Sequence, residues 1–285
     1  MKKQRSELMT TIQDQRRKLE KSLQVYREYK VVKANDLIQK SRFYLTTQEQ
    51  KIILYLITKI KPKDINLKEH IFKIQDFCEL CGLDKTSGGN YEYIKKTLKD
   101  LRDKSIWITT ETDDEITLSW LDYVKLNKDS GAVTIKISEL IKPYLLLLQE
   151  NFTQYEVLYI LAMKSQYSIR LYELLKSYAF QKKHLFEINE LKKTLSAEAY
   201  NLFGNFKQKV LDISLREINE LSDISVSYEI IKEGRKFTKI EFFIKTKKDM
   251  RERLETWKNI ENIIDPPQMS MFHEKLKIED IINKI

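Results

Sequence analysis

The chain has 285 residues, of which 42% are apolar, 33% are charged, six are glycine and four are proline. This length suits one large or two ordinary domains, and this composition favours a helix-rich soluble protein with packed cores. No apolar run approaches the length of a transmembrane helix, and the residues that follow Met1 are too charged for a signal peptide. We therefore expect a cytoplasmic protein with no membrane partner.

The formal net charge of +9 indicates a polyanionic partner. Residues 1–33 hold ten Lys or Arg and four Asp or Glu, which gives +6 and leaves +3 for residues 34–285. We interpret residues 1–30 as a basic N-terminal arm or helix, which either contacts phosphates or is a solvated tail. In the nearly balanced remainder, a nucleic-acid site has to come from local clusters of charge.

Organised structure is expected from Val31, and its first part follows the order of a winged helix-turn-helix domain. The predicted elements are a helix over residues 47–59, a strand over 70–74, a short helix over 77–81, a basic helix over 91–104, and β segments over 106–110, 115–126 and 132–137. A capping box formed by Thr46 and Glu49 begins the first helix, and Gly82 ends the second.

A second copy of this architecture follows Pro143. Its predicted elements are helices over residues 152–163 and 165–178, a basic helix over 205–220, and hairpin strands over 224–231 and 237–244. The segment HIFKIQDFCEL at His70 matches HLFEINELKKT at His184, at an offset of 184 − 70 = 114 residues. The sequence therefore predicts an α+β, helix-rich fold with two tandem winged helix-turn-helix domains related by internal duplication. The expected parts are domains over 31–148 and 149–248, and a C-terminal helix with a flexible tail over 249–285.

Catalytic and metal-binding patterns are absent from the sequence. None of the six glycines precedes a lysine, so no phosphate-binding loop is predicted, and no pair of histidines stands near a tyrosine as a metal-dependent nicking enzyme needs. Cys78 and Cys81 lack two further zinc ligands, because His70, His184 and His273 stand alone. We interpret the two cysteines as small buried thiols, and expect no catalytic site, no metal and no cofactor.

The second copy offers the better candidates for DNA binding. The start of a second helix in a helix-turn-helix reaches base edges in the major groove, where Asn and Gln suit adenine and Lys suits guanine or phosphate. The candidates at this helix are Asn205, Lys207, Gln208 and Lys209, preceded by Tyr200 and followed by Arg216 as a phosphate or structural residue. The predicted basic wing comprises Lys232, Arg235, Lys236 and Lys239. The alternative is a solvated charged face.

The helix over residues 165–178 reads SQYSIRLYELLKSY. Its apolar face comprises Tyr167, Leu171, Leu174, Leu175 and Tyr178, and its other face, expected to be solvated, comprises Ser168, Arg170, Glu173 and Lys176.

The wording of residues 167–175 closely resembles the signature of the iteron-binding plasmid replication initiators, which are built from two winged-helix domains, and the resemblance extends over residues 31–247. It implies that both domains bind directly repeated origin sites, which are called iterons. It also implies that the protein binds these sites as a monomer, opens the origin and brings in the replisome. It also implies that the first domain forms a dimer that represses the protein's own gene. By position, Lys207, Gln208 and Lys209 become base-reading candidates, and Lys95, Lys96 and Lys99 become phosphate-contact candidates.

Several relatives place more arginine where this chain has Lys207-Gln208-Lys209. The β segments between Glu115 and Ile137 offer a place for self-association. Further expected partners are the replicative helicase or its loader and the host initiator. The alternatives are a winged-helix transcriptional regulator without a replication role, and a protein in which the winged helices bind protein.

The C-terminal tail carries a separate candidate. After two prolines, the segment with Gln268, Met269, Met271 and Phe272 resembles the peptide by which many bacterial proteins bind the replicative sliding clamp. The glutamine can form hydrogen bonds at a pocket rim while the methionines and the phenylalanine fill an apolar cleft. The alternative is a tail whose apolar residues fold back on the second domain.

Overall fold

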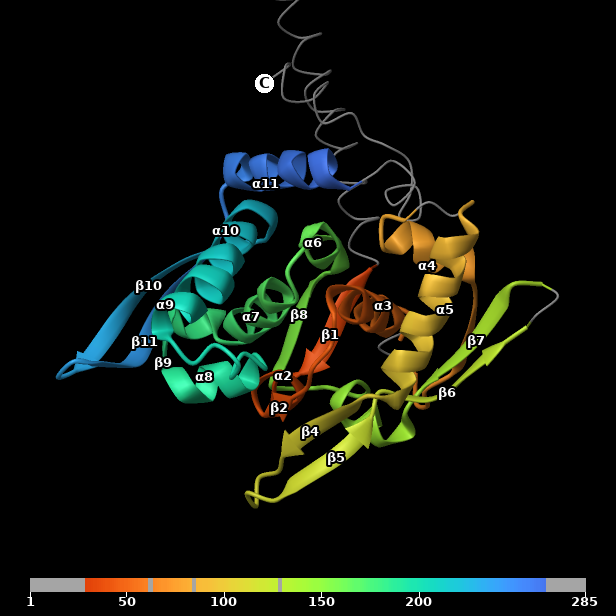
Figure 1. Ribbon diagram of the computed structural model, residues 1–285, viewed down its shortest axis with the longest axis horizontal. Coiled ribbons are helices and arrows are strands. Elements are labelled where there is room, and N and C mark those ends of the chain that lie inside the picture. The colour runs from red at the N-terminus through yellow and green to blue at the C-terminus, as the bar shows by residue number, and fades with distance from the viewer. Residues whose placement is uncertain (1–28, 61–63, 84–85, 128–129, 265–285) are drawn as a thin grey trace, which may run out of the picture.

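The computed structural model describes residues 29–60, 64–83, 86–127 and 130–264 (Figure 1). Two wing hairpins lie at opposite ends of the molecule, and helices α3 (Thr47–Thr58), α6 (Val157–Ala162) and α7 (Gln166–Ser177) lie between them. Within the described residues, no helix is long and apolar enough to cross a membrane. Residues 1–28 of the predicted N-terminal arm and the predicted clamp-binding segment of the tail lie outside the described residues, whereas Lys30, the last residue of that arm, begins strand β1 (Lys30–Ala34).

The first winged-helix unit has the predicted order. Its elements are α3 (Thr47–Thr58), β3 (Glu69–Lys73), α4 (Ile74–Leu80), α5 (Gly88–Asp103), β6 (Leu121–Leu126) and β7 (Ala132–Ile137), with the strands in the antiparallel order β3-β7-β6. The capping box of Thr46 and Glu49 is present, and Gly82 adopts a left-handed φ of 70° just after α4. Helix α4 begins earlier than predicted, because the Asp76 carboxylate accepts a hydrogen bond from the backbone N–H of Lys73.

The second winged-helix unit repeats this topology. Its elements are α7 (Gln166–Ser177), β9 (Lys183–Glu187), α8 (Ile188–Thr194), α9 (Phe203–Phe206), the π-helical turn η3 (Lys207–Leu211), α10 (Asp212–Leu221), β10 (Ile224–Glu233) and β11 (Lys236–Thr246). The strand order β10-β11-β9 mirrors that of the first unit. Strands β3 and β9, and helices α4 and α8, correspond end to end at the predicted offset of 114 residues (183 − 69 and 194 − 80). The structure therefore confirms two tandem winged-helix units.

The structure divides one predicted β segment into two strands and contradicts one predicted helix. Residues 115–126 form two strands, because β5 (Glu115–Ser119) joins β4 (Ser105–Thr109) and β2 (Ser41–Arg42) in one sheet, while β6 belongs to the wing. Buried Trp120 lies between β5 and β6. Residues 152–163 are not one helix. The alternating burial of Thr153 and Tyr155 belongs to strand β8 (Phe152–Glu156), which pairs with β1 (Lys30–Ala34), and only α6 (Val157–Ala162) is helical.

The expected solvated face of α7 is buried. Ser168, Arg170 and Glu173 have at most 3% of their surface exposed, and Lys176 is half-buried beside Asp223, with which it pairs. The cause is the first unit, whose helices α2 (Asn35–Gln39) and α3 pack against α7. Arg170 and Glu173 therefore find partners across the junction between the two units, in Ser41 and Lys33, instead of in water.

The remaining elements close the structure. Short helices η1 (Glu139–Tyr144) and η2 (Ala179–Gln181) connect larger elements. Helix α11 (Met250–Ile263) follows the predicted bounds closely and packs against α6 and α10, with the Trp257 ring 6.0 Å from that of Tyr159. Cys78 is buried and Cys81 is partly buried, and neither forms a disulfide with a described residue. Burial raises the pKa of Cys81 to about 12. The interpretation of both as small buried thiols is confirmed for Cys78, whereas Cys81 is only partly buried.

Candidate nucleic-acid interface

The predicted recognition helix of the second unit runs from α9 through the π-helical turn η3 into α10. Its apolar face is buried through Phe206, Val210, Leu211, Leu215 and Ile218. Asn205, Gln208, Lys209 and Arg216 are exposed on its other face. No ion pair joins Lys209 or Arg216 to any other described residue. These side chains are therefore available to bases and phosphates.

Lys207 lies differently from its neighbours. Its Nζ donates to both carboxylate oxygens of Asp212 at 2.9 Å, and the Tyr228 hydroxyl donates to the same carboxylate at 3.3 Å. The hydrogen bond with Asp212 raises the pKa of Lys207, and the neighbouring Tyr228 adds to this. Because Tyr228 lies on β10, this group ties the recognition helix to the wing. A base-reading role for Lys207 stays a prediction, and its present partners favour a role in holding the wing.

The wing hairpin β10–β11 also contacts the start of the recognition helix. The Phe237 ring stacks on that of Phe203 with centroids 4.4 Å apart, and Lys232 Nζ lies 4.7 Å above the Phe237 ring. Arg235 and Lys236 are exposed at the tip.

Two further candidates of the second unit have structural partners. Lys239 lies beside the carboxylates of Glu187 at 3.3 Å and Glu233 at 3.6 Å, so its charge is largely compensated. Tyr200 is half-buried, its carbonyl accepts a hydrogen bond from Lys192 Nζ at 2.6 Å, and its ring lies 6.0 Å from that of Tyr167. Its contacts support the loop that precedes α9.

The first unit presents a basic face on α5. Lys96 and Lys99 are exposed, whereas Lys95 pairs with Glu92 at 2.9 Å. A hollow of about 350 Å³ lies between side chains of α5 and β6, two elements that also pack against each other, and it is lined by Glu92, Lys95, Lys96, Lys99, Arg102, Val124 and Leu126. Arg102 was not among the residues predicted to contact phosphate. Arg102 follows Lys99 by three residues, which places both side chains on one face of the helix. This spacing could have identified Arg102 as a candidate from the sequence.

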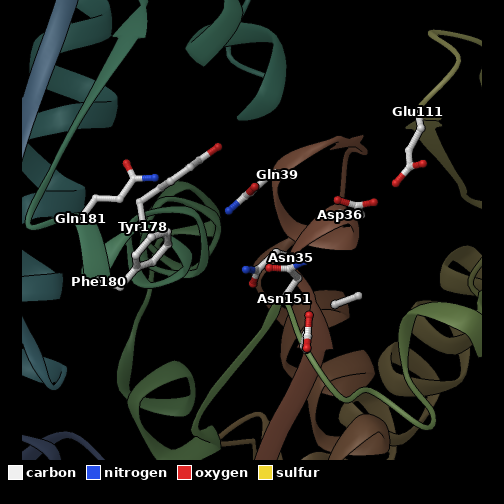
Figure 2. Close-up of a pocket in the computed structure, with 10 residues that line it drawn as sticks. Asn35, Asp36, Gln39, Glu111, Asn151, Tyr178, Phe180 and Gln181 are labelled. Carbon is white, nitrogen blue, oxygen red and sulfur yellow. The ribbon is translucent and has the colours of Figure 1, made fainter.

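A second pocket has the opposite electrostatic character. It has a volume of about 380 Å³, and its carboxylates come from Asp36, Glu111 and Glu150. Figure 2 shows Asp36 and Glu111 on one side of the pocket, facing Tyr178, Phe180 and Gln181 on the other. These carboxylates repel phosphate, so this pocket is not part of the nucleic-acid interface. Among the described residues, no cluster of His, Cys, Asp and Glu could hold a metal ion.

Comparison with known proteins identifies the family. A family model described as "Initiator Replication protein, WH1" matches residues 30–176, and one described as "Initiator Rep protein, WH2" matches residues 187–244. The PI protein of Escherichia coli is 31% identical over 148 residues, which cover 45% of this chain and 48% of that protein. The chain thus aligns with about half the length of this relative. A replication initiation protein of Escherichia coli is 27% identical over 219 residues, which cover 73% of this chain and 67% of that protein.

The fold has a solved counterpart. The crystal structure of the Pi initiator protein in complex with iteron DNA superposes with a TM-score of 0.62 at 23% identity, covering 78% of this chain and 99% of that chain. The shared fold agrees with the two family matches, which together extend over both winged-helix units. The chain belongs to the family of replication initiator proteins that carry tandem WH1 and WH2 winged-helix domains.

Proposed function

We propose that this protein initiates plasmid replication by binding directly repeated origin DNA through both winged-helix units. The observation that carries the proposal is the exposed polar face of the second recognition helix, beside a basic wing, in a chain of the initiator family. The related Pi initiator protein has been crystallised with iteron DNA. A monomer would use the second unit for most base contacts and the first unit for phosphates.

Each exposed side chain has a role that its chemistry suits. The amides of Asn205 and Gln208 can form paired hydrogen bonds with adenine, and Lys209 can donate to guanine or phosphate. Basic residues on the wing, on α5 and on α10 would neutralise phosphates and fix the register on the duplex. This set comprises Arg216, Lys232, Arg235, Lys236, Lys96, Lys99 and Arg102.

Self-association is proposed through the first unit. Strand β5 pairs on one side with β4 and has no partner strand on its other side among the described residues. Trp107 of β4 is 46% exposed and pairs across the strands with Thr117 of β5. An edge strand beside an exposed aromatic ring is a template for pairing with a second copy. The dimer would repress the protein's own gene, while the monomer acts at the origin.

Contacts with host proteins would then complete initiation. The proposed partners are the replicative helicase or its loader, the host initiator and the sliding clamp. The clamp proposal rests on the sequence of residues 268–272 alone, and a short segment that orders on binding is expected to bind with micromolar affinity.

Binding of duplexes from the DNA beside the gene tests the proposal. We expect the protein to bind duplexes that contain direct repeats. We expect the double substitution Gln208→Ala and Lys209→Ala to weaken this binding by roughly 5- to 150-fold for each base contact that is lost, since one contact contributes about 1–3 kcal/mol. Lys258→Ala is the matched control, because this exposed lysine lies on α11. An unchanged footprint in the double variant removes these residues from the interface. Preference for an inverted repeat alone favours a transcriptional regulator.

A further inference from the structure

The end of α6, the turn that follows it and the first residue of α7 lie where the two winged-helix units meet, and we call these residues, 161–166, the junction turn. Three side chains of α3, in the first unit, donate to its carbonyl oxygens. Lys51 Nζ donates to Leu161 O at 2.6 Å. The Thr47 hydroxyl donates to Lys164 O at 3.1 Å, and the Gln50 amide donates to Gln166 O at 3.1 Å.

The recognition helix of the second unit binds the same turn from the other side. The Glu217 carboxylate on α10 accepts hydrogen bonds from the backbone N–H groups of Lys164 and Ser165, at 3.2 Å. Its neighbour Arg216 is exposed, whereas Glu217 is only 9% exposed, so one residue of this helix faces solvent and the next faces the junction turn. Hydrogen bonds between an ionised carboxylate and backbone N–H groups are among the stronger ones in proteins.

A continuous series of contacts therefore connects the two recognition helices. Helix α5 packs on α3, α3 binds the junction turn, and the junction turn binds α10. The two charged groups that hold the turn, on Lys51 and Glu217, are both at least 91% buried. Buried polar bonds are directional, and loosening one leaves a desolvated group unpaired, so they oppose the sliding that a purely apolar contact would permit.

We propose that the junction turn fixes the distance and rotation between the two recognition helices, and thereby the spacing of the two DNA segments that one molecule reads. Lys51 and Glu217 are its positioning residues. This inference rests on the proposed function, in which both units bind one duplex. Inserting one base pair between the segments separates them by about 3.4 Å and rotates them by about 34–36°. A rigid junction rejects this change, and a loosened junction accommodates it.

The test uses duplexes that the full-length wild-type protein selects from a random-sequence library. The selected site is then remade with one or two base pairs inserted or deleted between its two segments, and also as a half-site bound by the second unit alone. We expect wild-type affinity to fall about tenfold or more at every altered spacing. In Lys51→Met and Glu217→Ala the loss is expected to shrink to about threefold or less, with half-site affinity unchanged.

Two control variants separate positioning from general stability. Lys247→Met removes a similarly buried lysine, which joins α10 to α11 within the second unit, and is expected to keep the wild-type spacing profile. Glu217→Gln keeps an acceptor oxygen and is expected to restore most of the discrimination. Thermal melts establish that each variant is folded. If Lys51→Met and Glu217→Ala unfold the protein, Thr47→Val replaces them in the test, because it removes only the exposed hydrogen bond from the Thr47 hydroxyl to the junction turn.

The outcomes distinguish the inference from the proposed function. Folded junction variants that keep the wild-type spacing profile overturn the inference, as does a wild-type protein that binds all spacings equally. A wild-type protein that selects no sequence overturns the proposed function instead.

Discussion

The buried ion pair between Lys33 and Glu173 offers a quantitative test of how the two units are joined. Both residues are 1% exposed, and the Glu173 carboxylate accepts hydrogen bonds from Lys33 Nζ and from the Tyr155 hydroxyl. Lys33 lies on β1, while Glu173 lies on α7. The substitution Glu173→Ala leaves the ammonium group of Lys33 buried without its counter-ion.

The expected cost follows from this geometry. Removing one partner of a buried ion pair lowers the free energy of unfolding by about 3–5 kcal/mol. Burial lowers the pKa of Lys33, and loss of Glu173 lowers it further, because Glu173 is the charge that opposes the effect of burial. Lys33 can then lose its proton, which sets a ceiling on the cost. Replacing both groups, as in Lys33→Met with Glu173→Leu, removes both desolvation penalties and is expected to recover most of the loss.

Urea unfolding at pH 7, followed by circular dichroism, measures these differences. Glu190→Ala is the control, since it breaks an exposed pair with Lys193 and is expected to cost less than about 1 kcal/mol. The reasoning is refuted if Glu173→Ala is within about 1 kcal/mol of the wild type, or if the double variant is as unstable as the single one.

Three further predictions concern binding, pH and assembly. Lys99→Ala is expected to reduce the slope of log affinity against log salt concentration by about 0.9. Lys95→Ala is expected to reduce this slope by less, because Glu92 already pairs with Lys95. Equal slopes for the two variants in a salt titration contradict this prediction. Burial, and then Glu173, raises the pKa of Tyr155 well above 10, so above that pH the folded protein retains a proton that the unfolded chain loses. The free energy of unfolding should therefore fall as the pH rises above 10, by up to about 1.4 kcal/mol per pH unit for this group. The urea midpoint should fall less steeply with pH in Tyr155→Phe than in the wild type. Trp107→Glu is expected to shift sedimentation from dimer to monomer, and a dimer of unchanged affinity would exclude the β4–β5 face.

The repeated architecture was predictable because its signals are local. The capping box at Thr46, the glycine after α4 and the alternating residues of β3 and β9 each act within a few positions. The buried face of α7 was not predictable in this way. Helical periodicity assigns polar residues to solvent, yet Arg170 donates to the Ser41 carbonyl at 2.8 Å and lies 4.6 Å above the Phe43 ring. These partners are more than 120 residues away in sequence, and no local pattern reveals them.

The residue types of the candidate site were predictable from the sequence, but the ion pairs that these residues form were not. Exposed polar side chains at the start of a recognition helix follow from the helix-turn-helix order. Lys207 and Asp212 are five residues apart, a spacing that does not bring side chains together in a regular α-helix. The π-helical turn between them, with its i to i+5 bonding, makes them neighbours. The compensation of Lys239 likewise depends on the register of β11 against β9, which pairs Lys239 with Glu187.

The position of the initiator signature within the structure explains what that segment does. Residues 167–175 lie on α7, and none of the exposed side chains of the proposed interface comes from this helix. Its leucines pack in the core, while Arg170 and Glu173 bind Ser41 and Lys33 of the first unit. The WH1 family match itself ends at residue 176, inside a helix that serves as the first helix of the second unit. The segment by which the sequence is most readily recognised is therefore the joint between the two units, and in the proposed function its residues would affect DNA binding only through the positions of the helices that it holds.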